Sequence, residues 1–126
     1  MQHVPIEIYK ENLQKIIQHP ATQAHNPRLI IITPPPVNEY QLKEFDDAKD
    51  TAHPSRTAQR AKEYAEAAKE VGAALKVPVA DVWGTFMSTV GWQEGQALIG
   101  SRDLPANHEF SNLFTDGMYC WIPLPV

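Results

Sequence analysis

The sequence predicts an α/β fold built around a short parallel β-sheet, and three observations carry this prediction. Two short runs, residues 29–33 and 79–83, are interpreted as buried strands, and the first of them is continuous and mostly β-branched. A long amphipathic stretch, residues 56–75, lies between them, and the order strand–helix–strand makes the two strands parallel. The length of 126 residues allows one modest domain rather than two.

The first predicted element is a helix that begins after Pro5 and ends before Pro20. Proline is favoured at the start of a helix, where its missing N–H costs nothing. Apolar residues recur at helical spacing and form one stripe, which consists of Ile6, Tyr9, Leu13, Ile16 and Ile17. The polar residues that follow, as far as Pro27, predict a loop.

The first predicted strand, residues 29–33, is a continuous apolar run, which is typical of a strand buried on both faces. Pro34, Pro35 and Pro36 follow directly, so the chain leaves the sheet without starting a helix. In open α/β sheets, ligands bind outside the carboxyl ends of the strands. The three prolines are therefore the candidate rim of a substrate pocket.

The stretch 37–55 is acidic, has few large apolar side chains, and is predicted to be a surface loop with one helical turn at most. The stretch 56–75 is the clearest helix in the sequence, with Ser55 as its N-cap. Small apolar residues recur every three or four positions and indicate close packing on a flat surface, most simply a sheet. They are Ala58, Ala61, Ala65, Ala68, Val71 and Leu75.

Pro78 ends this helix, and residues 79–83 form the second predicted strand. Residues 84–90 fit a short helix, and residues 92–112 are predicted to be mostly loop because Gly95, Gly100 and Pro105 interrupt them. Two strands and two helices leave the sheet incomplete. We therefore expect an unpaired strand edge through which the chain could associate with itself.

Composition excludes several classes of function. The net charge of −4 without a block of Lys or Arg argues against nucleic-acid binding. The sequence contains neither an apolar run of the roughly 20 residues that a membrane span needs nor a secretory signal, so we expect a cytoplasmic protein. Cys120 has no second cysteine to pair with, and the five histidines lack metal-ligand spacing. We therefore expect no metal site.

Nucleophile motifs are missing as well. The serines at positions 55, 88, 101 and 111 occur in neither a Gly-x-Ser-x-Gly nor a Gly-Asp-Ser context, so they fit caps and loops. The pair Asp116-Gly117 is by itself a turn signal.

Several segments, taken in order, carry a resemblance to a known family. Residues 27–39, Pro-Arg-Leu-Ile-Ile-Ile-Thr-Pro-Pro-Pro-Val-Asn-Glu, resemble a distinctive block of the SGNH (GDSL-type) ester hydrolases, in particular of the isoamyl acetate-hydrolysing esterases. Residues 2–13, 56–83 and 113–117 are similar to the adjoining blocks. The resemblance implies that residues 1–117 are the C-terminal part of an SGNH-hydrolase-like domain, with an incomplete, flavodoxin-like three-layer αβα fold. The tail, residues 118–126, departs from the family.

The resemblance also implies a chemistry, since this family hydrolyses short-chain carboxylic esters through a serine acyl-enzyme and without a cofactor. Asp116 matches the catalytic acid, but Tyr119 stands at the position of the histidine. The serine, glycine and asparagine of the family's site have no counterpart here. Because such groups act as a unit in catalysis, we expect a truncated member of the family that is inactive alone. If the chain is active, its expected substrate is a small ester.

Two other interpretations stay open. The chain could be a non-catalytic interaction partner that uses its open strand edge, or an accessory protein of a biosynthetic pathway. Without the resemblance, it could be a small α/β binding module with its pocket at the rim formed by Pro34, Pro35 and Pro36.

Overall fold

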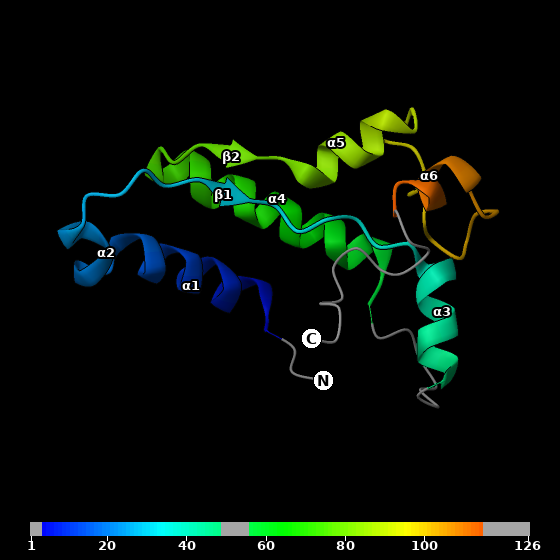
Figure 1. The fold of residues 1–126 in the computed structure, drawn as a ribbon, viewed down its shortest axis with the longest axis horizontal. Coiled ribbons are helices and arrows are strands. Elements are labelled where there is room, and N and C mark those ends of the chain that lie inside the picture. Colours follow the sequence, from blue (N-terminus) through cyan, green and yellow to red (C-terminus); the bar gives the residue numbers. More distant parts are fainter. Residues whose placement is uncertain (1–3, 49–55, 115–126) are drawn as a thin grey trace.

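A computed structural model describes residues 4–48 and 56–114 of the chain (Figure 1). Six helices and two strands occur in this described part. They are α1 (Ile6–Gln18), α2 (Pro20–Ala24), β1 (Ile31–Ile32), α3 (Glu39–Ala48), α4 (Ala58–Leu75), β2 (Val79–Ala80), α5 (Val82–Thr89) and α6 (His108–Asn112).

The two strands pair in parallel, with Ile31 opposite Val79 and Ile32 opposite Ala80. At one end the N–H of Ile31 donates to the carbonyl of Pro78 over 2.9 Å. The predicted α/β class and partial parallel sheet are thereby confirmed, with α4 as the connecting helix. Both strands are shorter than the predicted runs 29–33 and 79–83. The three-layer arrangement stays a prediction.

Helices α1 and α4 cover one face of this sheet. Ile31 is buried on that face, where it packs with Ile17 of α1 and with Ala68 and Val71 of α4. Successive side chains of a strand point to opposite faces. Ile32 is accordingly 65% exposed, as Ile30 is at 66%. The prediction that this strand is buried on both faces is therefore wrong for the described structure.

Helix α1 begins directly after Pro5, as predicted, and ends at Gln18. Three members of the predicted stripe, Tyr9, Leu13 and Ile17, pack in the cluster beneath the sheet. Ile16 is an exception, because 63% of it is exposed. The loop expected after Pro20 contains the short helix α2.

Helix α4 confirms the prediction of close packing, since Ala65 and Ala68 are completely buried. It begins at Ala58, and its N-cap is Thr57, whose hydroxyl accepts the N–H of Arg60 over 3.2 Å. The predicted cap at Ser55 is therefore wrong, because the helix starts two residues later than expected.

The surface loop predicted for residues 37–55 is instead largely the helix α3. The side chain of Asn38 accepts the N–H of Tyr40 over 3.1 Å and so caps the first turn. Val37 and Leu42 flank this cap at the spacing of a hydrophobic staple, and both are buried. The buried staple anchors α3 against the rest of the protein.

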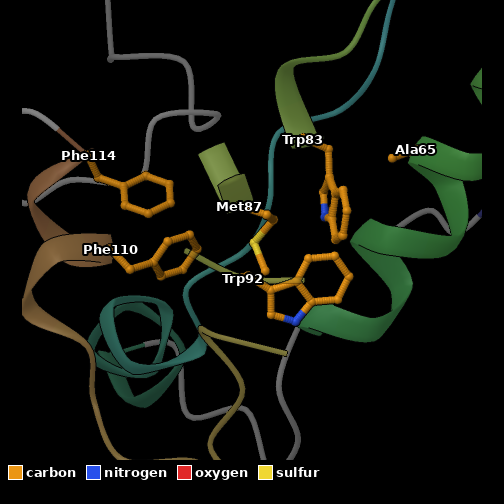
Figure 2. Close-up of a cluster of buried hydrophobic side chains, with 6 residues drawn as sticks. All are labelled: Ala65, Trp83, Met87, Trp92, Phe110 and Phe114. Atoms are coloured by element: carbon orange, nitrogen blue, oxygen red, sulfur yellow. The ribbon is translucent and has the colours of Figure 1, made fainter. Parts of the chain in front are cut away.

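A second core lies beyond the carboxyl end of the sheet (Figure 2). Its buried members come from α4, α5, α6 and the loops that follow, and they are Ala65, Trp83, Met87, Trp92, Phe110 and Phe114. Trp83 belongs to α5, which begins at Val82 rather than at Gly84, so the predicted strand ends early. The segment 92–112 is mostly loop, as predicted, and ends in the short helix α6.

None of the helices in the two described ranges has the length and apolar character needed to cross a membrane.

Candidate functional site

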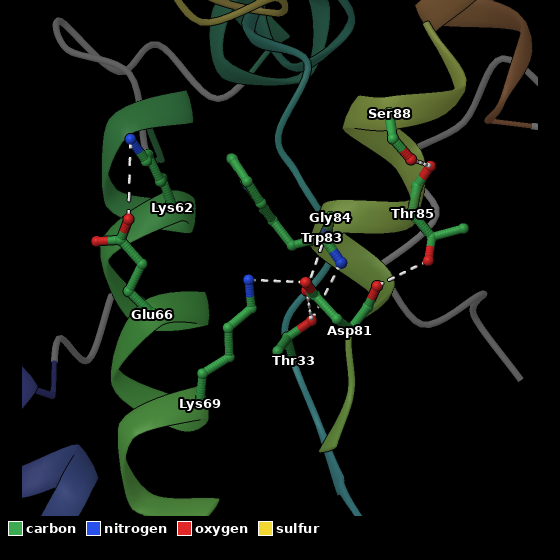
Figure 3. Close-up of polar contacts among 9 residues, drawn as sticks. All are labelled: Thr33, Lys62, Glu66, Lys69, Asp81, Trp83, Gly84, Thr85 and Ser88. Atoms are coloured by element: carbon green, nitrogen blue, oxygen red, sulfur yellow. Dashed lines mark hydrogen bonds and ion pairs between the residues drawn. The ribbon is translucent and has the colours of Figure 1, made fainter. Parts of the chain in front are cut away.

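The carboxyl ends of β1 and β2 meet at Asp81, the residue that follows β2 (Figure 3). Asp81 is the N-cap of α5, and its Oδ1 accepts the backbone N–H of Gly84 over 2.9 Å. The hydroxyl of Thr33, which follows β1, donates to the same oxygen over 3.2 Å. One carboxylate therefore ties the ends of both strands to the first turn of α5.

Thr33 bridges the Asp81 carboxylate and the backbone N–H of Trp83. Only 1% of it is exposed, and its hydroxyl oxygen accepts the backbone N–H of Trp83 over 3.1 Å. The same hydroxyl donates to Asp81. Thr33 thus satisfies an N–H group in the first turn of α5 and fixes where Trp83 enters the second core.

Lys69 of α4 completes the cluster. Its ammonium nitrogen lies 2.7 Å from Oδ2 of Asp81 and 6.0 Å from the centroid of the Trp83 ring. Partial burial raises the pKa of the Asp81 carboxyl, but hydrogen bonds from Lys69, Gly84 and Thr33 and the charge of Lys69 outweigh it and lower the pKa. Asp81 is therefore an ionised acceptor near neutral pH.

A shallow, open depression adjoins this cluster. It is lined by Ala80, Asp81, Val82, Thr85 and Phe86. The lining is mainly apolar, and the only charge in it is that of Asp81, which Lys69 neutralises. This surface could receive an apolar group, but the Asp81 carboxylate is a weak base and a weak nucleophile because Lys69, Gly84 and Thr33 engage its oxygens and lower its pKa.

The three prolines of the predicted rim do follow β1 at the carboxyl end of the sheet. Pro34 and Pro35 are half-buried, and Pro36 is buried. They lead into α3 rather than into the depression, whose lining does not include them. Their role as the rim of a substrate pocket stays a prediction.

The candidate acid, Asp116, lies outside the described residues, as do Tyr119 and the tail 118–126. The described serines hydrogen-bond to groups other than histidine. Ser88 donates to the carbonyl of Thr85, and Ser111 donates to that of Asn107 while its oxygen accepts the side-chain amide of Asn38. Within residues 4–48 and 56–114, no histidine is hydrogen-bonded to a serine, and no cluster of three His, Cys, Asp or Glu could hold a metal. This part of the chain therefore does not assemble a nucleophile with a base.

The cluster of Thr33, Lys69 and Asp81 was not anticipated from the sequence, which placed Asp81 inside a strand. A signal was nevertheless present. An aspartate directly before a short apolar helical segment is a favoured N-cap, and Gly84 stands three residues later, where the capped N–H belongs.

Comparisons with known proteins agree with the resemblance read from the sequence. No family model and no solved structure matches the chain. The chain is similar to a GDSL esterase/lipase of Arabidopsis thaliana, with 32% identity over 93 residues, which are 73% of this chain and 39% of that protein. A second GDSL esterase/lipase of Arabidopsis thaliana is 29% identical over 97 residues, 74% of this chain and 40% of that protein.

A GDSL esterase/lipase of Oryza sativa subsp. japonica is 28% identical over 90 residues, which are 71% of this chain and 34% of that protein. The chain thus spans two-fifths or less of the length of these relatives. These similarities support a relationship to part of a GDSL-type protein.

Proposed function

We propose that this chain contributes a sheet-and-helix portion of a GDSL-type ester hydrolase, because it is similar to plant GDSL esterase/lipases over about three-quarters of its length. The observation that carries the proposal is the agreement of this similarity with the parallel pairing of β1 and β2 across α4. In such a sheet the reaction would take place outside the carboxyl ends of the strands. The segments that bear Thr33, the three prolines and Asp81 lie at that end.

The substrate class of the proposed hydrolase is a short-chain carboxylic ester, and isoamyl acetate is a candidate substrate. Asp116 would supply the acid that orients a histidine base, and Pro34, Pro35 and Pro36 would form part of the rim. These assignments rest on the resemblance of residues 27–39 and 113–117 to the family.

We further propose that these 126 residues do not hydrolyse esters by themselves. Two features support this. The described serines and histidines do not form a hydrogen-bonded pair, and Tyr119 stands where the family has its histidine. A tyrosine with an ordinary pKa of about 10 is protonated at neutral pH and is a poor general base. Without a nucleophile and base, little stabilisation of the transition state remains.

A chimaera tests the family function. In it, the 93-residue matched region of the Arabidopsis thaliana protein is replaced by the matching region of this chain. We expect the folded chimaera to hydrolyse p-nitrophenyl acetate, with the unchanged parent assayed in parallel. A folded but inactive chimaera beside an active parent would contradict the proposal.

A separate assay tests the inactivity of the chain alone. Purified chain, checked by circular dichroism, should leave p-nitrophenyl acetate at its background rate of hydrolysis. Hydrolysis that is abolished by Asp116→Ala would show that a working site assembles within these residues, and the proposed inactivity would be wrong.

The second candidate function is that of a non-catalytic binding partner. The observation that favours it is the outer edge of β1, which pairs with no other strand among the described residues and carries the exposed Ile30 and Ile32.

A further inference from the structure

Asn38 links the start of α3 to the short helix α6. Its side-chain amide nitrogen donates to the hydroxyl oxygen of Ser111, which belongs to α6, over 3.1 Å. The hydroxyl proton of Ser111 is used elsewhere, because it is donated to the carbonyl of Asn107. The oxygen therefore remains as an acceptor, and the bond joins segments that are neighbours in space (Figure 1) but 73 residues apart in sequence.

Both ends of the Asn38 amide have partners. Only 5% of this residue is exposed, and a buried amide costs free energy unless its groups are hydrogen-bonded. Its oxygen accepts the N–H of Tyr40, and its nitrogen donates to Ser111. Gln41 adds a second contact, since its amide nitrogen lies 3.4 Å from the carbonyl oxygen of Ser111. The first turn of α3 thus holds Ser111 by its side chain and by its backbone.

Helix α6 depends on such contacts for its position. It has five residues, His108–Asn112, and a helix of that length is not stable by itself in water. On the side of the second core, the rings of Phe110 and Phe114 pack edge to face with their centroids 5.2 Å apart (Figure 2). The ring of Phe86, in α5, lies 5.9 Å from that of Phe114. Polar bonds from α3 and aromatic contacts in the second core therefore fix α6 together.

The segment between β1 and Asn38 is stiff and fixed at its start. Each of the three prolines, 34–36, restricts the backbone to one narrow range of φ. Pro36 and Val37 are buried, and Thr33, before the prolines, is hydrogen-bonded to Asp81. Asn38 therefore has a defined position relative to the carboxyl end of β1, where the proposed reaction would take place.

The chain that leaves α6 leads directly to the candidate acid. Asp116 follows Phe114 by two residues, and two residues of chain span at most about 7 Å. The position of Phe114 therefore limits where the acid can be. In a hydrolase with a serine, a histidine and an acid, the acid holds the histidine in its working orientation. A misplacement of about 1 Å at such a site can cost roughly a hundredfold in rate.

We propose that Asn38 is a positioning residue for the candidate acid of the hydrolase. Through Ser111 it holds α6 and Phe114 at a fixed place beyond the carboxyl end of β1, and thereby sets the point from which the chain continues to Asp116. The inference rests on the proposed function, because it assigns Asp116 the role of the acid. Asn38 itself touches no reacting atom in this account.

Two variants remove the bond in different ways. Asn38→Ser keeps an oxygen that can cap α3, since serine is also a favoured N-cap, but has a shorter side chain without an amide nitrogen. Ser111→Ala removes the acceptor. The matched control is Ser88→Ala, because Ser88 also donates to a carbonyl of its own helix but is exposed and lies in α5. Circular dichroism checks that every variant is folded.

Hydrogen exchange on the full chain tests the structural step. The backbone N–H groups of Phe110, Leu113 and Phe114 donate within α6 and its ends. In Asn38→Ser and in Ser111→Ala these three amides should exchange about two- to tenfold faster than in the wild type, because α6 opens more often. In Ser88→Ala their exchange rates should be unchanged.

The chimaera with the Arabidopsis thaliana relative tests the catalytic step. For this purpose it takes the residues of this chain as far as Gly117 and the relative's own sequence after them, so that the relative supplies the residue at the position of Tyr119. Asn38→Ser should lower kcat for p-nitrophenyl acetate by about tenfold or more. The double variant with Ser111→Ala should lose no more than the larger single loss, because both changes remove the same bond.

The pH profile distinguishes positioning from a loss of folded protein. A displaced acid stabilises the protonated histidine less, so the acidic limb of kcat should move to lower pH in Asn38→Ser. A smaller fraction of folded enzyme would scale the whole profile without moving it.

Unchanged exchange in α6, an unchanged kcat or an unmoved acidic limb in an active chimaera, or an equal effect of Ser88→Ala would each overturn the inference alone. An inactive chimaera beside an active parent would overturn the proposed function, and the inference with it.

Discussion

The ammonium group of Lys69 lies 2.7 Å from the carboxylate of Asp81 and thereby joins the middle of α4 to the carboxyl end of β2. The same carboxylate caps α5 and accepts the hydroxyl of Thr33. Three elements that are separate in sequence are therefore held at one point.

Asp81→Ala should lower the free energy of unfolding by about 1–2 kcal/mol, chiefly through loss of the cap on α5. Its partly exposed ion pair with Lys69 adds at most about 1 kcal/mol. Urea denaturation at pH 7 measures the difference. Asp103→Ala is the control, because Asp103 is exposed and lies in a loop. Equal midpoints for the two variants would contradict the role of Asp81.

The contribution of Asp81 should depend on pH in one direction. Its pKa is lowered in the folded protein, so the native state favours the ionised form. The stabilisation is fully present above the unfolded pKa of about 4 and is lost as the pH falls through the folded value. The difference in unfolding free energy between the wild type and Asp81→Ala should therefore shrink below about pH 4. A difference in unfolding free energy that stays constant from pH 7 to pH 3 would show that ionisation of Asp81 does not cause the stabilisation.

Thr33→Val should cost about 1–3 kcal/mol, although the two side chains have nearly the same shape. The variant leaves the N–H of Trp83 without its acceptor in a buried position. Thr89→Val is the matched control, since Thr89 is exposed and its hydroxyl donates only to the carbonyl of Thr85. Thermal and urea denaturation of both variants should show a clear loss of stability relative to the wild type for Thr33→Val alone.

Gly100→Ala should destabilise the protein more than Gly95→Ala. Both glycines have positive φ angles, +97° and +92°, so both variants bear the backbone strain of about 1 kcal/mol or more. At Gly100 a Cβ would also lie 2.6 Å from the carbonyl oxygen of Val37 and from a ring carbon of Phe110, whereas at Gly95 it meets open space. Similar unfolding free energies for the two variants would show that this close approach does not matter.

Ala65→Leu should cost about 1–3 kcal/mol because it overfills a packed core. Ala65 is fully buried in the cluster that contains Trp83 and Trp92. The rings of these two tryptophans pack edge to face, with their centroids 5.3 Å apart. Ala74→Leu places the same side chain on the exposed face of α4 and serves as the control. The near-ultraviolet circular dichroism of the tryptophans should change only in Ala65→Leu.

The elements that the sequence predicted well are those with a long repeated pattern. The small residues of α4 recur through five turns, and the stripe of α1 is bounded by prolines, so both helices could be located. Helix α3 was missed because its side chains are mostly polar, and its start depends on the local cap at Asn38 rather than on a repeat. The exposure of Ile32 was missed because an apolar run indicates a preference for burial, not which neighbours are present to cover it.

The candidate site was predictable only in part. The position of the three prolines beyond β1 follows from chain order alone. The cluster around Asp81 depends on contacts between Thr33 and Asp81, 48 residues apart, which no local pattern encodes. The assignment of Asp116 still rests on the resemblance.

The pairing of β1 with β2 also bears on the order of folding. The chain between Ile31 and Val79 must form a closed loop before the first bond of the ladder can stabilise it, and such closure slows folding. Helix α4, by contrast, needs only contacts within its own 18 residues. We therefore expect α4 to form early and to serve as the template on which the strands come into register. The hydrogen bonds at Thr33 would then be among the last to close.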